Sequence, residues 1–186
     1  TIDSSWTTLQ VEGNASIRKI VEDVDGSVLI GGGFTSVLGV SNAQFIRVNS
    51  SGTAVLNHII LSASTEAGIV NDFVVDSNRE ITIGGSFLSY SGNSGISSRP
   101  GLVRVDSDFA LDVTLSTGFT NLSEINTIAF DNLTNSYYVG GLFSSYSGEV
   151  EGNVVKIDTF GAIDTSFSAG TGFDTAVNTI SIQPLS

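Results

Sequence analysis

Three near-copies of one nine-residue phrase constrain the fold of this chain more than any other feature. Each copy holds a Gly-Gly pair and, two residues after it, a phenylalanine; the copies are Val28–Ser36, Ile81–Ser89 and Tyr137–Ser145. The first glycines of the pairs, Gly31, Gly84 and Gly140, lie 53 and then 56 residues apart. A period of roughly 40 to 50 residues is typical of four-stranded propeller blades, because the coils of a solenoid are shorter. The repeat therefore indicates an array of small sheets.

Further segments recur in the same order around this phrase and predict the remaining strands. Alternating apolar residues precede it at 17–24, 70–76, 125–131 and 177–183. A second apolar run follows it at 45–49, 102–106 and 154–158, and a looser fourth run is clearest at 163–167 and 2–6. Period-two alternation, β-branched residues and short polar links are typical of strands. We therefore predict an all-β chain without helices.

The order of these segments predicts the architecture. With the strands of one unit lettered a to d, the chain reads d, then a-b-c-d three times, then a. This is the pattern of a repeat β-propeller built of four-stranded antiparallel blades, with about three and a half blades in the chain. Residues 1–186 then form a single propeller region. Its units are residues 17–69 (unit 1), 70–124 (unit 2) and 125–176 (unit 3), with partial units at 1–16 and 177–186.

A partial ring of blades would expose apolar faces and strand edges to water, and propellers close with about four to eight blades. Two solutions stay open at this point. The chain is an arc of a longer polypeptide, or two copies pair head to tail into a ring of about seven blades. Because both ends of the sequence fall inside a repeat unit, we expect the arc.

The glycine pair and its phenylalanine are expected to serve packing. Glycine within a strand marks a close approach of neighbouring backbone, a bulge or a bend. The phenylalanine beyond each pair is then placed to wedge between blades. These repeat positions are Gly31, Gly32, Phe34, Gly84, Gly85, Phe87, Gly140, Gly141 and Phe143.

Charge and composition exclude several classes of partner. The formal net charge of −12 repels a phosphate backbone, and the sequence has no basic stripe for nucleic acid. No apolar run is long enough to span a membrane. Cysteine is absent, which excludes disulfides and thiolate metal sites. Three basic residues, Arg47, Arg104 and Lys156, share one repeat position, and we expect salt bridges or packing stems there rather than a binding ring.

The sequence offers no reaction centre. The only histidine, His58, lies in a strand-like segment without a nucleophile motif, so we predict a surface or packing residue rather than a catalytic one. Asp23-Val24-Asp25-Gly26 resembles the opening of a calcium loop but lacks the closing bidentate glutamate, which favours a turn. We predict no cofactor and no metal site, with weak calcium binding at the acidic surface as the alternative.

The links between strands b and c are the best candidates for a contact surface. Because antiparallel strands alternate in direction, these links, at 37–44, 89–100 and 145–153, all emerge on one face of the ring. Loops on a rigid scaffold often carry binding specificity. Tyr90, Asn93 and Tyr146 are the candidates to contact a sugar or a protein neighbour there. For the two tyrosines we favour the other interpretation, that they cap the rim of a blade.

These motifs together resemble the delta-60 repeat propeller family. The resemblance rests on Gly-Gly-x-Phe, a Tyr-Ser-Gly loop, an Arg-hydrophobic-Asp strand and the closing Ile163–Phe167 and Gly170–Phe173 elements, and it covers almost the whole chain. Unit 1 departs most, since it has Val37-Leu38-Gly39 in place of Tyr-Ser-Gly. Proteins of that family are large secreted or surface proteins of bacteria and virion proteins of bacteriophages, including tail-fibre and baseplate components. The resemblance implies a non-catalytic scaffold and names no catalytic residues.

We therefore expect a structural and interaction module of a phage virion, such as a tail fibre, or of a bacterial surface protein. Its partners would be protein neighbours in a larger assembly or the remaining blades of a longer chain, and its location would be extracellular, on a cell surface or in a virion. The alternative is a carbohydrate- or receptor-binding module that uses the loop face. An enzyme with carboxylates lining a propeller channel is a third hypothesis.

Overall fold

The computed structural model describes residues 9–12, 16–64, 66–92, 95–120 and 123–183. Within these residues every regular element is a β-strand and all strands pair antiparallel, which confirms the all-β prediction. The strands are β1 (Val11–Glu12), β2 (Ile17–Glu22), β3 (Val28–Gly32), β4 (Ser36–Val37), β5 (Val40–Ser41), β6 (Phe45–Val48), β7 (Val55–Ser62), β8 (Ile69–Val75), β9 (Ile81–Ser86), β10 (Ser89–Gly92), β11 (Gly95–Ser98), β12 (Leu102–Val105), β13 (Glu124–Asp131), β14 (Ser136–Leu142), β15 (Ser145–Tyr146), β16 (Glu149–Val150) and β17 (Val154–Asp158).

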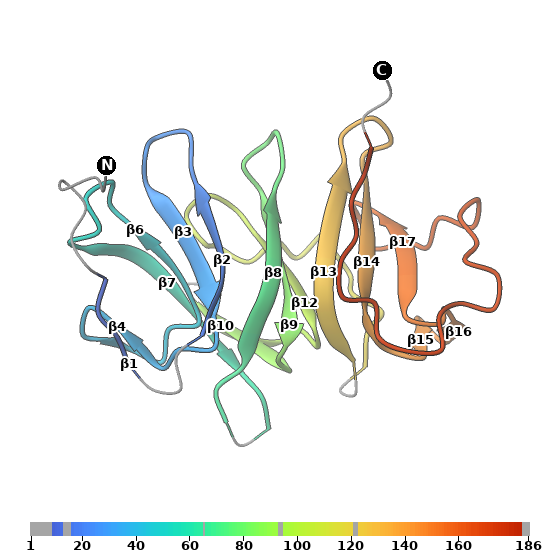
Figure 1. Ribbon diagram of the computed structural model, residues 1–186, viewed down its shortest axis with the longest axis horizontal. Coiled ribbons are helices and arrows are strands. Elements are labelled where there is room, and N and C mark those ends of the chain that lie inside the picture. Colours follow the sequence, from blue (N-terminus) through green and yellow to red (C-terminus); the bar gives the residue numbers. More distant parts are fainter. Residues whose placement is uncertain (1–8, 13–15, 65, 93–94, 121–122, 184–186) are drawn as a thin grey trace.

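Three main sheets lie side by side in chain order across the molecule (Figure 1). Strands β2, β3, β6 and β7 belong to unit 1, β8, β9 and β12 to unit 2, and β13, β14 and β17 to unit 3. In each unit the strand with the double glycine, strand b, lies between strands a and c and is hydrogen-bonded to both. No closed sheet occurs among the described residues.

The predicted fourth strand is complete only in unit 1, where β7 pairs along β6. In units 2 and 3 it is reduced to the single bridges between Val105 and Leu111 and between Ile157 and Ile163. The reason is local, because an aspartate directly follows the bridging residue in both units. Asp112 accepts hydrogen bonds from the backbone and hydroxyl of Thr114, and Asp164 accepts them from Ser166 in the same way. Such side-chain turns compete with a strand ladder. Four-stranded sheets in every unit were therefore a wrong expectation.

The two end segments of the prediction have different outcomes. Residues 2–6, expected as a strand d, lie outside the described residues. Residues 177–183, expected as a strand a, are described but form no strand. They lack a hydrogen-bonded ladder within the described part of the chain, and instead run beside β14, where the Val177 N–H donates to the Gly141 carbonyl at 2.9 Å.

The apolar core lies largely between the units. One cluster combines Phe45, Ile59 and Leu61 of unit 1 with residues of unit 2 such as Phe73 and Phe87. A second cluster combines residues of unit 2, such as Leu115 and Phe119, with strands of unit 3. Each sheet therefore buries one face against the next sheet, as expected for a repeat whose units cannot bury their apolar surface alone.

Candidate contact surfaces

The first glycine of each pair forms a notch that the next unit fills. A methyl group placed on Gly84 would lie 2.6 Å from Cγ2 of Ile125 and 2.8 Å from Cδ1 of Ile128, both on β13. Gly31 and Gly140 repeat this arrangement, with the pair Val70 and Phe73 and the pair Val177 and Ile180 respectively. We call these three sites the glycine notches, and the apolar residues that enter them the knob pairs. Without a Cβ, the backbone of strand b allows the neighbouring strand a to approach closely.

The second glycine of each pair meets the backbone at the start of the strand a that pairs with it. A methyl group on Gly85 would overlap the carbonyl oxygen of Ile69, and Gly32 and Gly141 would meet Ser16 and Glu124 in the same way. Opposite each pair, strand a carries a register shift, as between Val70 and Asp72 on β8. We expected each glycine pair to mark a close backbone approach, a bulge or a bend. The first two features occur together at each pair: the backbones of strands a and b lie close, and strand a is bulged.

The three phenylalanines beyond the glycine pairs are buried, with Phe34 fully inaccessible and Phe87 and Phe143 at most 4% exposed. The ring of Phe143 lies 4.9 Å from that of Phe119, which belongs to the preceding unit, in an edge-to-face contact. Phe119 also contacts the ring of Tyr146 at 4.7 Å. Phe87 and Phe143 thus lie in the apolar layer between two units, whereas Phe34 lies in a cluster of unit 1 residues against which Leu9 and Val11 pack.

The two tyrosines that were candidates for a contact surface are buried. Tyr90 and Tyr146 are completely inaccessible, and their hydroxyls donate to the carbonyl oxygens of Phe109 and Gly161, each at 2.7 Å. Burial raises the pKa of Tyr146 to about 12 and also raises the pKa of Tyr90. Neither ring is open to a surface contact, because the links fold back on the preceding unit, and this burial favours the interpretation of the two tyrosines as caps of the blade rim. Asn93 lies outside the described residues.

The b-to-c links are hairpins rather than free loops. In unit 2, β10 and β11 pair with each other, and β10 also pairs with β7, the last strand of unit 1, so that Tyr90 lies opposite Leu61. In unit 1 the hairpin of β4 and β5 pairs in the same way with β1. In unit 3, β15 and β16 pair with each other, and one backbone hydrogen bond links this hairpin to unit 2: the Ser147 N–H donates to the Gly118 carbonyl at 2.9 Å. Each hairpin therefore ties two consecutive units together.

The cations at the shared position on strand c are buried and paired. Arg47 bonds Asp23 at 3.0 Å, Arg104 bonds Asp112 at 2.6 Å, and Lys156 bonds Asp164 at 2.8 Å. Their side chains are at most 11% exposed. The hydrogen bond from Lys156, followed by those from Ser166, lowers the pKa of Asp164 to about 2. These cations act as salt-bridged packing stems and do not form a ring open to an anionic ligand.

A polar ladder that the sequence reasoning missed joins the strands a of successive units. The amide of Asn71 donates to the Ile125 carbonyl at 2.9 Å, and the Asn126 amide donates to the Val177 carbonyl at 3.4 Å. One residue further along β8, a carboxylate oxygen of Asp72 accepts from the Ile128 N–H at 2.8 Å. The signal was present in the sequence, because asparagine recurs directly after the first knob residue of successive units.

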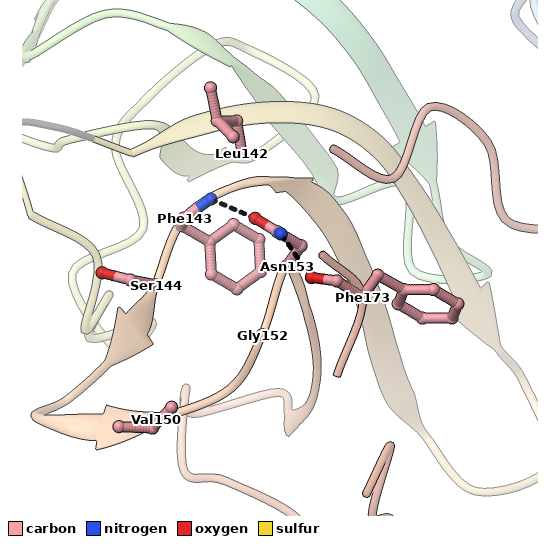
Figure 2. A pocket seen from close by; sticks show the side chains of 7 residues that line it. All are labelled: Leu142, Phe143, Ser144, Val150, Gly152, Asn153 and Phe173. Atoms are coloured by element: carbon pink, nitrogen blue, oxygen red, sulfur yellow. Dashed lines mark hydrogen bonds between the residues drawn. The ribbon is translucent and has the colours of Figure 1, made fainter. Parts of the chain in front are cut away.

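A hollow of about 430 Å³ lies in unit 3 (Figure 2). The side-chain oxygen of Asn153 in its wall accepts from the Phe143 N–H, and the Asn153 amide donates to the Phe173 carbonyl, both at 2.8 Å. The rim carries apolar side chains that are 51%, 86% and 56% exposed, namely Leu142, Val150 and Phe173. Apart from Ser144 and Asn153, the side chains that line the hollow are apolar.

The remaining candidates for chemistry have structural places. His58 is exposed on β7. The acidic segment between β2 and β3 is a turn, in which the Gly26 N–H donates to the Asp23 carbonyl and Asp25 accepts from the Ser27 N–H. Among the described residues no group of three or more metal-ligating side chains comes together. Nor does any helix long and apolar enough to cross a membrane occur in the part of the chain that the structure describes.

Comparison with known proteins agrees with this architecture. The family described as "Domain of unknown function (DUF5122) beta-propeller" matches residues 25–54 and 134–167. Both segments begin at the turn between strands a and b and end beyond strand c, so corresponding parts of units 1 and 3 are matched, together about a third of the chain. The match supports a β-propeller repeat family. No curated protein and no solved structure matches the chain.

Proposed function

We propose that this chain is a non-catalytic structural and interaction module, an arc of about three and a half propeller blades that contacts protein neighbours. Its setting is a bacteriophage virion, such as a tail fibre, or a bacterial surface protein. The proposal follows the resemblance to the delta-60 repeat propellers and is supported by the β-propeller family match to units 1 and 3.

The observation that carries the proposal is that the characteristic side chains of the repeat are already engaged in contacts within the chain. In the described residues, the knob pairs, the wedge phenylalanines, the hairpin tyrosines and the strand c cations are all engaged in contacts within or between units. Large apolar side chains remain exposed in each of the three units, as with Ile20 on β2, Ile96 on β11 and Phe173 in unit 3. Exposed apolar side chains of this kind are typical of protein contact sites.

The location is tested by fractionating the natural source. Quantitative mass spectrometry of purified extracellular particles, cell envelopes and cytosol should find the chain enriched in particles or envelopes. Protease treatment of intact particles or cells should release its peptides. Recovery of the chain from cytosol alone, as a monomer, would overturn the proposal.

The carbohydrate alternative loses the observation on which it rested. It required the rings of Tyr90 and Tyr146 to be open to a sugar, and both rings are inaccessible. An aromatic stacking site needs an exposed face. We therefore do not extend the proposal to a glycan.

A further inference from the structure

The outer strand of the unit 2 hairpin, β11, forms an edge of the six-stranded sheet, and within the described part of the chain no strand pairs with its outer side. Unit 2 lies between units 1 and 3, which pack against its two faces (Figure 1). The open edge is therefore a property of the hairpin itself. The corresponding strands of units 1 and 3, β5 and β16, have two residues each, whereas β11 has four.

The backbone groups on the open side of β11 belong to Ile96 and Ser98. On the inner side, next to the ladder with β10, the Arg99 N–H donates to the Leu88 carbonyl at 2.8 Å. Because successive residues of a strand direct their N–H and C=O groups to opposite sides, Ile96 and Ser98 direct theirs away from β10. The Ser98 carbonyl accepts from the Arg99 side chain at 2.8 Å, an exposed bond that a partner strand can replace.

The side chains of β11 do not protect this edge. The strand reads Gly95-Ile96-Ser97-Ser98, so it carries no charge, and Ile96 is 79% exposed. Strand β16 of the unit 3 hairpin, in contrast, begins with Glu149. Charged side chains on an edge disfavour pairing with another strand, whereas an uncharged, apolar edge is a template for it. Both the length and the side chains of β11 thus favour the addition of a strand.

The charge around β11 favours an acidic partner. Arg99, which directly follows the strand, forms no ion pair among the described residues, whereas five other cations of the chain do. No acidic residue occurs between Glu80 and Asp106, although the whole chain contains 19. The hairpin is therefore a locally basic place on an acidic protein. Complementary charge selects the partner and speeds association.

We propose that β11 binds an extended, acidic segment of a protein neighbour, which adds to the sheet as a further strand. The inference rests on the proposed function, because it gives the chemistry of the protein neighbour. Backbone groups of Ile96 and Ser98 hold the segment, and a carboxylate of the segment pairs with Arg99. The same hairpin already joins two units by strand pairing, since Ser91 on β10 lies opposite both Ile60 on β7 and Ile96 on β11. An apolar residue of the segment continues this row beside Ile96.

The test uses two synthetic hexapeptides with blocked ends, in which valine alternates with threonine. The acidic probe has one aspartate at its end, and the basic probe has a lysine in the same place. Each probe is titrated into the isotope-labelled full chain, and binding is followed by nuclear magnetic resonance. We expect the acidic probe to bind about tenfold more tightly than the basic probe, and less tightly at high salt. It should slow hydrogen exchange at the N–H groups of Ile96 and Ser98, because carbonyls of the probe accept from them.

Two variants test the two parts of the site. Ile96→Pro removes an outward N–H, a change that an edge strand tolerates, and should abolish binding of the acidic probe. Arg99→Glu should reverse the preference, so that the basic probe binds more tightly. Its matched control is Arg18→Glu, which makes the same change of charge at an exposed arginine of β2 and should keep the wild-type preference. Circular dichroism checks that each variant is folded.

Binding of neither probe, equal binding of both, or a preference that survives Arg99→Glu would refute the site. Binding that leaves hydrogen exchange at Ile96 and Ser98 unchanged would refute strand addition. Sedimentation equilibrium without a probe covers the other occupant: a dimer that protects the same two N–H groups would replace the acidic segment by a second copy of the chain. A chain that is enriched in particles but binds neither probe loses only this site. A chain that binds the acidic probe but occurs in cytosol alone loses only the proposed function.

Discussion

The replacement Gly84→Ala tests whether the glycine notch holds units 2 and 3 together. The added methyl group would lie 2.6 Å and 2.8 Å from side-chain carbons of Ile125 and Ile128, well inside ordinary contact distance. Overpacking of this kind costs about 1–3 kcal/mol. Glycine in a strand is itself unfavourable by roughly 0.5–1 kcal/mol relative to alanine, which offsets part of that cost. We therefore expect a net loss of about 1–2 kcal/mol.

Two neighbouring replacements calibrate this loss. Gly85→Ala places its methyl group on the carbonyl oxygen of Ile69, where rigid backbone must move, and should cost roughly 3 kcal/mol or more. Gly33→Ala is the control, because its methyl group would lie 3.2 Å from the hydroxyl of Ser16, a small side chain that can rotate. This variant should stay within about 0.5 kcal/mol of wild type.

The assay is urea unfolding followed by circular dichroism, with thermal unfolding as a second measure, in which 1 kcal/mol corresponds to roughly 2–4 °C for a chain of this size. A double-mutant cycle with Ile125→Ala isolates the contact. Because the smaller residue makes room for the methyl group, the double variant should be more stable than the sum of the single losses predicts, by about 1 kcal/mol. Strictly additive losses, or a Gly84→Ala variant as stable as Gly33→Ala, would refute the notch as the cause.

Three further predictions concern the paired polar groups. Arg104→Ala leaves Asp112 in a buried place without its cation and should lower the free energy of unfolding by about 3 kcal/mol, measured in urea; the conservative Arg104→Lys should recover part of it. The pKa of Asp164 lies at about 2, below its ordinary value of 3.8, so its stabilising effect is complete above pH 4 and is lost as the pH falls toward 2. In an acid titration of stability, Asp164→Asn should remove that part of the pH dependence. An unchanged profile would contradict the pairing of Asp164 with Lys156. Tyr146→Phe loses the hydrogen bond to Gly161 and should cost about 1–2 kcal/mol, while ultraviolet titration should show one tyrosine fewer that ionises only near pH 12.

The inner three strands of each unit could be predicted from the sequence because their signal is local and repeated. Alternation of apolar residues marks one buried face, and the glycine pair recurs where backbone must come close, as at Gly84 and Gly85. The fourth strand could not be predicted in the same way. An aspartate such as Asp112 offers the chain a turn that competes with the ladder, and alternation alone does not weigh the two.

The candidate contact site at the tyrosines is buried for a physical reason that cannot be read from the sequence. A tyrosine in a long, polar link is typical of an exposed loop, but Tyr90 belongs to a hairpin that extends the sheet of the preceding unit. That pairing joins β10 to β7, strands separated by β8 and β9 in the chain, and no local pattern reports it.

The apolar clusters show that the stability of each unit depends on contacts with the neighbouring units. Leu61 of unit 1 shares its cluster with Phe87 and Tyr90 of unit 2, and Phe119 of unit 2 shares its cluster with Phe143 of unit 3. The hairpins, the polar ladder and the glycine notches cross the same boundaries. Since nearest-neighbour terms dominate such arrays, a unit is stabilised by the surface that the next unit presents rather than by an interior of its own.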